Sequence, residues 1–121
     1  MEAKRILAIE DEQDLLDLYG YLFETAGYEV TTSLTGEFMV QQIQAFGPDL
    51  VLLDVNLGGL NGSRLCREIK SDPAMDHIVV ILVSGESNKY ELLSESGSDA
   101  FIAKPFDMDH LLHKVQQLIA A

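Results

Sequence analysis

Polar side chains follow four short apolar runs of this chain, and their types suit them to act together on a charged ligand. They are Glu10 and Asp11 after residues 6–9, Asp54 after residues 50–53, Ser84 after residues 78–83, and Lys104 after residues 100–103. If the runs are neighbouring parallel strands, these side chains meet at the carboxyl edge of one sheet, where open α/β folds bind ligands.

Three carboxylates at one edge repel one another, so at neutral pH they must share protons or bind a cation. Hard oxygen ligands suit Mg²⁺, which takes one or two carboxylates and completes its shell with water and phosphate oxygens. The charges also balance, because one Mg²⁺ together with Lys104 offsets Glu10, Asp11 and Asp54. The pattern therefore predicts a site for Mg²⁺ and a phosphoryl group.

Asp54 is the predicted nucleophile of this site. A carboxylate beside a metal and a lysine can attack a phosphoryl donor and form an acyl phosphate. Charge spreads over the phosphoryl oxygens in the transition state, and Mg²⁺, the Ser84 hydroxyl and the Lys104 ammonium could stabilise it.

The elements that must position these residues alternate along the whole chain, with five strand-like runs and five helical patterns. Such alternation predicts repeated βα units and a mostly parallel sheet covered on both faces. Residues 50–53 and 78–83 show no polar alternation, which is typical of central strands buried on both faces. Residues 28–32 alternate, which favours a strand nearer the edge.

Apolar spacing predicts the helices and their inner faces. The first helix has an inner face of Leu15, Leu18, Tyr19, Leu22 and Ala26, and Gly27 ends it. Gly20 inside this helix costs about 1 kcal/mol relative to Ala, which suggests close packing there. Further helices are expected from Met39 to a stop at Gly47-Pro48, around Leu65 and Ile69, over residues 90–96, and after Asp107.

Composition limits the partners. The 121 residues, 47% of them hydrophobic, predict one domain over residues 1–121. A net charge of -12 repels nucleic-acid phosphates and anionic membranes, so neither is expected as a partner. The single cysteine, Cys66, and the lack of an apolar leader at the N-terminus favour the cytoplasm, and no apolar run is long enough to span a bilayer.

These residues resemble the receiver domain of two-component response regulators, and the similarity to chemotaxis-type single-domain receivers covers essentially the whole chain. The segments that carry the resemblance are Glu10-Asp11, the run Asp-Val-Asn-Leu-Gly-Gly-Leu-Asn-Gly from Asp54 to Gly62, Ser84-Gly85, and Phe-Ile-Ala-Lys-Pro-Phe from Phe101 to Phe106. Each segment alone is a weak signal, whereas four in order on an alternating β/α pattern are highly specific.

The resemblance implies a flavodoxin-like, doubly wound five-stranded parallel sheet in the order 2-1-3-4-5, flanked by five helices. It implies that Asp54 accepts a phosphoryl group from the phosphohistidine of a histidine kinase or phosphotransfer protein. The chain would then be a phosphoacceptor that assists its own phosphorylation and dephosphorylation rather than an enzyme, working as a monomer or a phosphorylation-dependent dimer.

The resemblance also assigns roles to single residues. Asp11, Asp54 and the Asn56 carbonyl would bind Mg²⁺ directly, and Glu10 would do so through water. Ser84 and Phe101 would form the switch that alters the surface of the fourth helix, fifth strand and fifth helix. Lys104-Pro105 would be a cis peptide.

Three departures from the family pattern affect this chain. Gly58 replaces a common proline four residues after Asp54, so a less rigid loop is expected. Phe101 lacks the hydroxyl of the tyrosine found in many relatives and could signal only by packing. Asn56 and Glu86 occupy the two positions that tune the phosphoryl lifetime.

Other interpretations stay open from the sequence alone. Asp11 could cap the first helix and Asp54 could form a turn. His110 and His113, three apart on the last helix, could pair on a metal, but a solvated face is favoured because no third ligand lies nearby in the sequence. A degenerate receiver could serve only as an interaction module. An aspartyl-phosphate phosphatase would need an acid in place of Asn56, and an FMN carrier would not place carboxylates beside the flavin phosphate.

Overall fold

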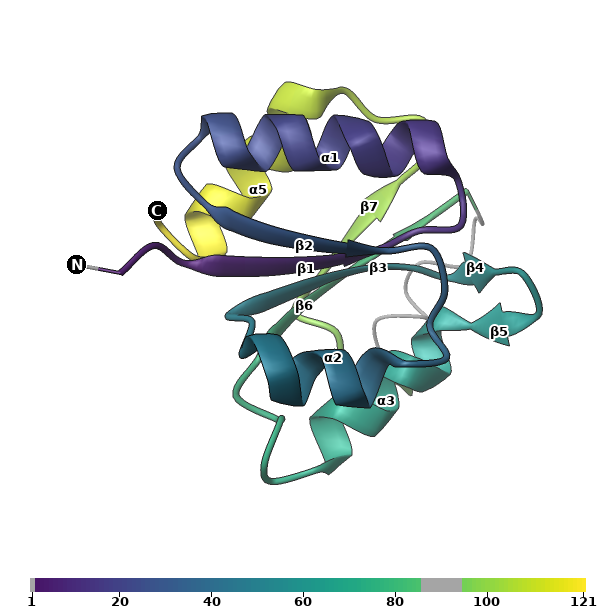
Figure 1. The fold of residues 1–121 in the computed structure, drawn as a ribbon. Coiled ribbons are helices and arrows are strands. Elements are labelled where there is room, and N and C mark those ends of the chain that lie inside the picture. The colour runs from purple at the N-terminus through teal and green to yellow at the C-terminus, as the bar shows by residue number, and fades with distance from the viewer. Residues whose placement is uncertain (1, 86–94) are drawn as a thin grey trace.

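The computed structural model describes residues 2–85 and 95–121, in which a five-stranded parallel sheet is covered by helices on both faces (Figure 1). Its strands lie in the order β2-β1-β3-β6-β7, which is the predicted order 2-1-3-4-5. Their bounds are β1 Arg5–Ile9, β2 Glu29–Ser33, β3 Leu50–Asp54, β6 Val79–Ser84 and β7 Ala100–Ala103.

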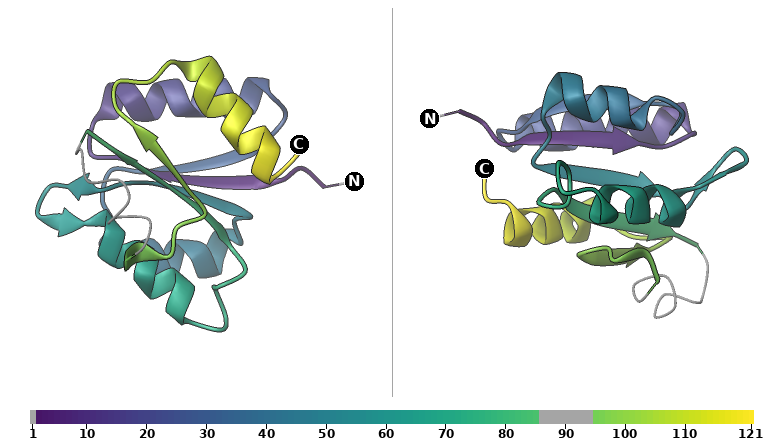
Figure 2. Two further views of the ribbon diagram at one scale, coloured as in Figure 1. Left: turned by 180° about the vertical axis from the view of Figure 1, so that it is seen from behind. Right: turned by 90° about the horizontal axis from the view of Figure 1, so that it is seen from below.

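Two helices cover each face of the sheet within the described residues, as the front and back views show (Figures 1 and 2). The α1/α5 face carries α1 (Gln13–Thr25) and α5 (Met108–Leu118), and the α2/α3 face carries α2 (Met39–Phe46) and α3 (Gly62–Ser71). The predicted helix over residues 90–96 lies largely outside the described residues. In the described ranges, no helix is long and apolar enough to cross a membrane.

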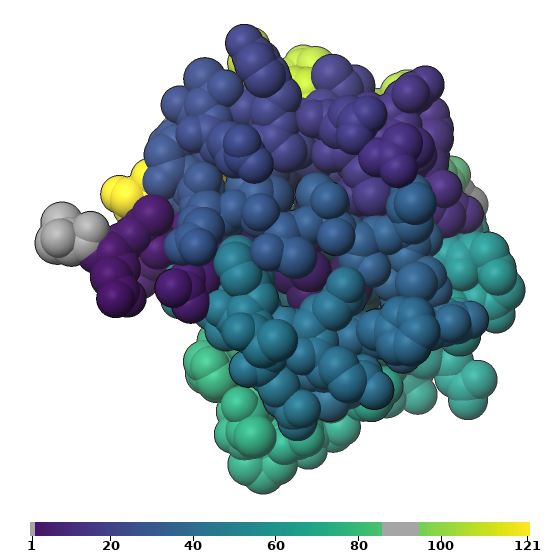
Figure 3. All heavy atoms as spheres, in the orientation of Figure 1, coloured from purple at the N-terminus to yellow at the C-terminus, as the bar shows by residue number. Residues whose placement is uncertain are grey.

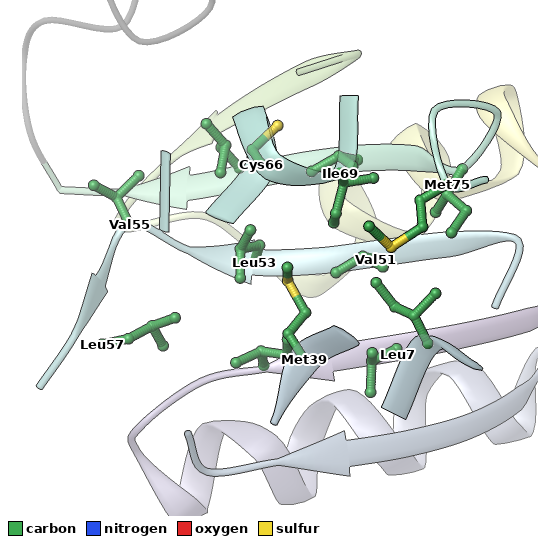
Figure 4. Packing of buried hydrophobic residues seen from close by; sticks show 14 residues of the cluster. Leu7, Met39, Val51, Leu53, Val55, Leu57, Cys66, Ile69 and Met75 are labelled. Carbon is green, nitrogen blue, oxygen red and sulfur yellow. The ribbon is translucent and has the colours of Figure 1, made fainter. Parts of the chain in front are cut away.

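Each face of the sheet has its own buried cluster, because successive strand side chains point to opposite faces. Ile6 and Ala8 belong to the cluster on the α1/α5 face, whereas Leu7 and Ile9 belong to the one on the α2/α3 face. Figure 4 shows the second cluster, where side chains from β1, α2 and α3 gather around β3. Every residue of β3 is buried, as its unbroken apolar run predicted.

The first helix confirms its predicted position but corrects its predicted inner face. Its fully buried residues are Leu16, Tyr19 and Phe23, while Leu18 is 52% exposed. The buried stripe is therefore rotated away from Leu18. The close packing expected at Gly20 is wrong, because a Cβ at this position would meet nothing within 4 Å. Side chains of α1, β2 and α2 fill the gaps between the ribbons on this side of the molecule (Figure 3).

The segment after β3 forms a small hairpin that the sequence did not lead us to expect. Strands β4 (Asn56–Leu57) and β5 (Leu60–Asn61) pair antiparallel and project beyond the carboxyl ends of the large sheet (Figure 1). Gly58 and Gly59 join them with φ values of 54° and 101°. A two-residue turn with both φ values positive suits the twist of a hairpin, and a proline at position 58 could not adopt it. The glycine that replaces the family's proline thus has a defined role.

Candidate phosphoryl-acceptor site

The register of the sheet brings the predicted polar residues to one edge. Ile9 lies beside Leu53, and Asp54 lies beside Val83. Glu10, which follows Ile9, therefore lies level with Asp54 on the neighbouring strand, one strand spacing of about 4.8 Å away. Lys104 directly follows the last residue of β7 at the same edge.

Asp54 and Lys104 form the centre of this edge. The Lys104 ammonium donates to Asp54 Oδ2 at 2.5 Å and lies 3.4 Å from Glu10 Oε2. Asp54 and Glu10 are buried, with side chains 4% and 2% exposed, whereas Lys104 is 31% exposed. One lysine thus holds two buried carboxylates together and remains accessible from solvent.

The close carboxylates change the proton affinities at this edge. Burial, followed by a hydrogen bond with Asp54 and the charge of Asp54, raises the pKa of Glu10 to about 8. Burial alone would lower the pKa of Lys104, but the hydrogen bond and negative charge of Asp54 outweigh it and raise that pKa. At neutral pH the lysine is charged and the carboxyl pair retains a proton, which a bound cation would displace.

The backbone around Asp54 fixes the orientation of its carboxylate. Asp54 Oδ1 accepts the N–H of Asn56 at 2.7 Å, so the turn interpretation of Asp54 holds as well. Asn56 is exposed next to Asp54. Asp11 is also exposed, and it lies near the turn between β4 and β5, since a Cβ on Gly58 would be 4.0 Å from Asp11 Oδ2. The cap interpretation of Asp11 is wrong, because the N-cap of α1 is Glu12 and it makes no side-chain cap.

The two residues expected to form the switch lie on the neighbouring strands β6 and β7. Ser84 is completely buried at the end of β6, and its carbonyl accepts the Lys104 N–H at 2.8 Å. Phe101 is half-buried and packs against the cluster of the α2/α3 face. Glu86, expected to tune the phosphoryl lifetime, lies outside the described residues.

Gly62, the first residue of α3, supports the site in a way that sequence reasoning missed. A Cβ at this position would lie 2.0 Å from the carbonyl oxygen of Asp54 and 2.9 Å from the Cα of Val55. The Gly62 N–H also donates to the Val55 carbonyl at 2.7 Å. The sequence signal that could have revealed this role was the position of Gly62 at the end of the motif that begins at Asp54. The reason for glycine, however, is a contact made only in the folded structure.

The remaining sequence predictions concern residues around the site. Lys104-Pro105 is a cis peptide, as the resemblance implied. Asp107 caps α5 by accepting the His110 N–H at 2.9 Å. His110 and His113 are both exposed. Cys66 is buried, and burial raises the pKa of its thiol to about 11, so it is not an activated thiol.

The donor set at the edge fits Mg²⁺ in chemistry and in charge. Among the described residues, no three His, Cys, Asp or Glu side chains form a ready cluster for a metal. Mg²⁺ does not require one, since one or two carboxylates, waters and a phosphate oxygen complete its octahedral shell. Glu10 and Asp54 are close enough to share a hydrogen bond, and once their shared proton is released they are net negative even with Lys104 beside them.

A doubly wound parallel sheet with its polar residues at the carboxyl edge defines the flavodoxin-like class of fold. Residues 6–116 match the family described as the response regulator receiver domain. The chain belongs to this family, the receiver domains of two-component response regulators.

Individual relatives agree with this assignment. The chain is 30% identical to the alkaline phosphatase synthesis transcriptional regulatory protein PhoP of Bacillus subtilis, over 96% of this chain and 48% of PhoP. It is 31% identical to the phosphate regulon transcriptional regulatory protein PhoB of Rhizobium meliloti, over 95% of this chain and 52% of PhoB. The chain thus spans about half the length of these relatives.

A solved structure shows the same fold. The signal receiver domain of a signal transduction histidine kinase from Syntrophus aciditrophicus superposes with a TM-score of 0.89 at 29% identity. The match covers 98% of this chain and 91% of that domain. This chain therefore has the same architecture as that receiver domain.

Proposed function

We propose that this receiver accepts a phosphoryl group on Asp54 from the phosphohistidine of a histidine kinase or phosphotransfer protein. The observation that carries the proposal is the pairing of Asp54 with Lys104 beside Glu10, at the carboxyl edge of the sheet. In this proposal the chain is a phosphoacceptor of the cytoplasm and not an enzyme that turns over phosphate esters.

The chemistry assigns a role to each residue. An Asp54 oxygen attacks phosphorus while the bond from phosphorus to the histidine nitrogen breaks, which leaves an acyl phosphate and a free imidazole. The Lys104 ammonium, released from the carboxylate oxygen, pairs with a phosphoryl oxygen, and Ser84 supplies a hydroxyl. Glu10, Asp11, Asp54 and the Asn56 carbonyl would hold Mg²⁺, which would neutralise charge on the phosphoryl oxygens.

Phosphorylation must favour a second arrangement of the molecule by a few kcal/mol to change partner binding. New charge-assisted hydrogen bonds from Ser84 and Lys104 to the phosphoryl oxygens are of the required size. Because Ser84 ends β6 and its carbonyl accepts the Lys104 N–H, movement of either residue is transmitted to β7, which carries Phe101.

The test is labelling with a small radioactive phosphodonor such as acetyl phosphate, with and without Mg²⁺. Wild type should be labelled only with Mg²⁺, and Asp54→Asn should not be labelled. Asp76→Asn removes an exposed carboxylate before β6 and should be labelled like wild type. Labelling that survives in Asp54→Asn would exclude Asp54 as the acceptor.

A further inference from the structure

Tyr19 carries a buried hydroxyl that the fold alone does not explain. The residue is 1% exposed, and its hydroxyl has no hydrogen-bond partner among the described residues. A buried hydroxyl without a partner is costly, and buried tyrosines normally have one. Phenylalanine would supply the same ring without this cost, so the hydroxyl points to a partner in another state of the protein.

Tyr19 lies in the layer directly beneath the phosphoryl-acceptor site. It packs in the same buried cluster as the strand residues that precede the site by two positions, Ala8, Leu52 and Ile102. Side chains two positions apart in a strand project from the same face. The residues two positions further on are Glu10, Asp54 and Lys104. Tyr19 therefore lies on the α1/α5 face, on the same side as these three groups.

Aromatic contacts hold the Tyr19 ring at this place. It stacks on Phe106, two residues after Lys104, with 6.5 Å between ring centroids and 13° between planes, and on Phe23 at 6.2 Å. Burial raises the pKa of Tyr19, and the negative charges of Glu10, Asp54 and Glu12 raise it further. The hydroxyl therefore keeps its proton and can act as a hydrogen-bond donor.

Glu10 shares a hydrogen bond with Asp54, and its contacts with nitrogen donors are long. Its Oε1 accepts the Glu12 N–H at 3.3 Å, and its Oε2 lies 3.4 Å from the Lys104 ammonium. Both contacts are long compared with the 2.5 Å between Lys104 and Asp54. A carboxylate that helps to hold a metal is commonly fixed by a further hydrogen bond from behind.

We propose that Tyr19 is a positioning residue of this site, whose hydroxyl donates a hydrogen bond to Glu10, directly or through one water, when Mg²⁺ is bound. This inference rests on the proposed function. It assigns Tyr19 no contact with the phosphoryl group, so the hydroxyl acts only through the orientation of Glu10.

Tyr19→Phe tests the inference, with Tyr28→Phe as the matched control. Both residues are buried and both rings contact Phe23, but the Tyr28 hydroxyl donates to the Ile119 carbonyl at 2.6 Å, far from the site. Calorimetric titration should show Mg²⁺ binding about tenfold weaker in Tyr19→Phe and unchanged in Tyr28→Phe. Without metal, Tyr19→Phe should melt no lower than wild type, whereas Tyr28→Phe should melt lower.

Tyrosine absorbance provides a second measurement, since the chain has four tyrosines and no tryptophan. Mg²⁺ should perturb the near-ultraviolet spectrum of wild type and of Tyr28→Phe but not that of Tyr19→Phe. Equal Mg²⁺ affinity in Tyr19→Phe and wild type would overturn the inference and leave the proposed function standing. A wild type that binds no Mg²⁺ would remove both.

Discussion

The two faces of the sheet carry different parts of the candidate machinery. On the α1/α5 face, Glu10, Asp54 and Lys104 form a compact group of charges with Tyr19 beneath it. Phe101 packs against the apolar cluster of the α2/α3 face, and Ser84 is fully buried at the end of β6. Charge chemistry is therefore concentrated on one face, and Phe101, which is expected to respond to it, lies on the other.

This division shows where a signal has to pass. The central strands β1, β3 and β6 are almost entirely buried, so we expect the two faces to communicate where side chains of both reach the carboxyl edge. There the Lys104 N–H donates to the Ser84 carbonyl, and Gly62 of α3 touches the Asp54 carbonyl. A phosphoryl group on Asp54 would act on both of these contacts, which makes the edge the coupling element between the faces.

The largest expected effect comes from breaking the contact between α3 and Asp54. In Gly62→Ala the new methyl group would lie 2.0 Å from a backbone oxygen that no side-chain rotation can move away. Either α3 shifts from β3 or the strand end distorts, and we expect a loss of about 3 kcal/mol in the free energy of unfolding. Urea denaturation measures this loss, and phosphodonor labelling should fall with it. A loss below about 1 kcal/mol would show that α3 and the Asp54 backbone are not tightly packed at Gly62. The two faces would then not be coupled through this contact.

The second largest effect is expected from the ionisation of Glu10 on the α1/α5 face, which changes stability with pH in metal-free buffer. The pKa of Glu10 is about 8 in the folded protein, against an ordinary value of 4.5. Between these values the folded state binds more protons than the unfolded state, so stability is highest below the lower value and falls as pH rises toward 8. We expect a fall on the order of 2 kcal/mol across this window in wild type.

Glu10→Gln isolates the contribution of this carboxyl. The amide cannot titrate, so the decline in unfolding free energy between pH 5 and pH 8 should be largely absent from the variant, both measured with a chelator present. Identical slopes in the two proteins would mean that Glu10 is ionised in the folded state and that the charges of this face are arranged differently.

Ser84→Ala changes the end of β6 and should separate acceptance of the phosphoryl group from the response to it. Loss of the hydroxyl should cost about 1 kcal/mol of stability, and Asp54 should still be labelled. The backbone amide signal of Phe101 should shift on phosphorylation in wild type and shift much less in the variant, as nuclear magnetic resonance can measure. Equal shifts would show that Phe101 responds to the site without Ser84.

Sequence patterns predicted the strands and the polar carboxyl edge of the sheet, because both follow from which residues stand next to one another along the chain. The apolar runs gave the buried strands, and the parallel arrangement then brought Glu10, Asp54 and Lys104 together. The hairpin at Gly58-Gly59 escaped prediction because its strands are two residues each, too short for a periodic signal. The roles of Gly62 and Tyr19 arise from tertiary contact and leave no local pattern.

The smallest effect is expected at Gly20, where the sequence suggested close packing and the structure shows none. Gly20 lies inside α1 with an ordinary negative φ, and a Cβ there would meet nothing within 4 Å. Gly20→Ala should therefore raise stability by about 0.5–1 kcal/mol, since alanine restricts the unfolded chain and favours the helix. Thermal melting together with labelling tests this, and labelling should stay at the wild-type level. Glycine is required at position 62, where a Cβ would collide with the Asp54 backbone, and it is not required at position 20. Opposite effects of the two alanine substitutions on stability would confirm that α3, on the α2/α3 face, is fixed to the backbone of Asp54 and that α1 is not.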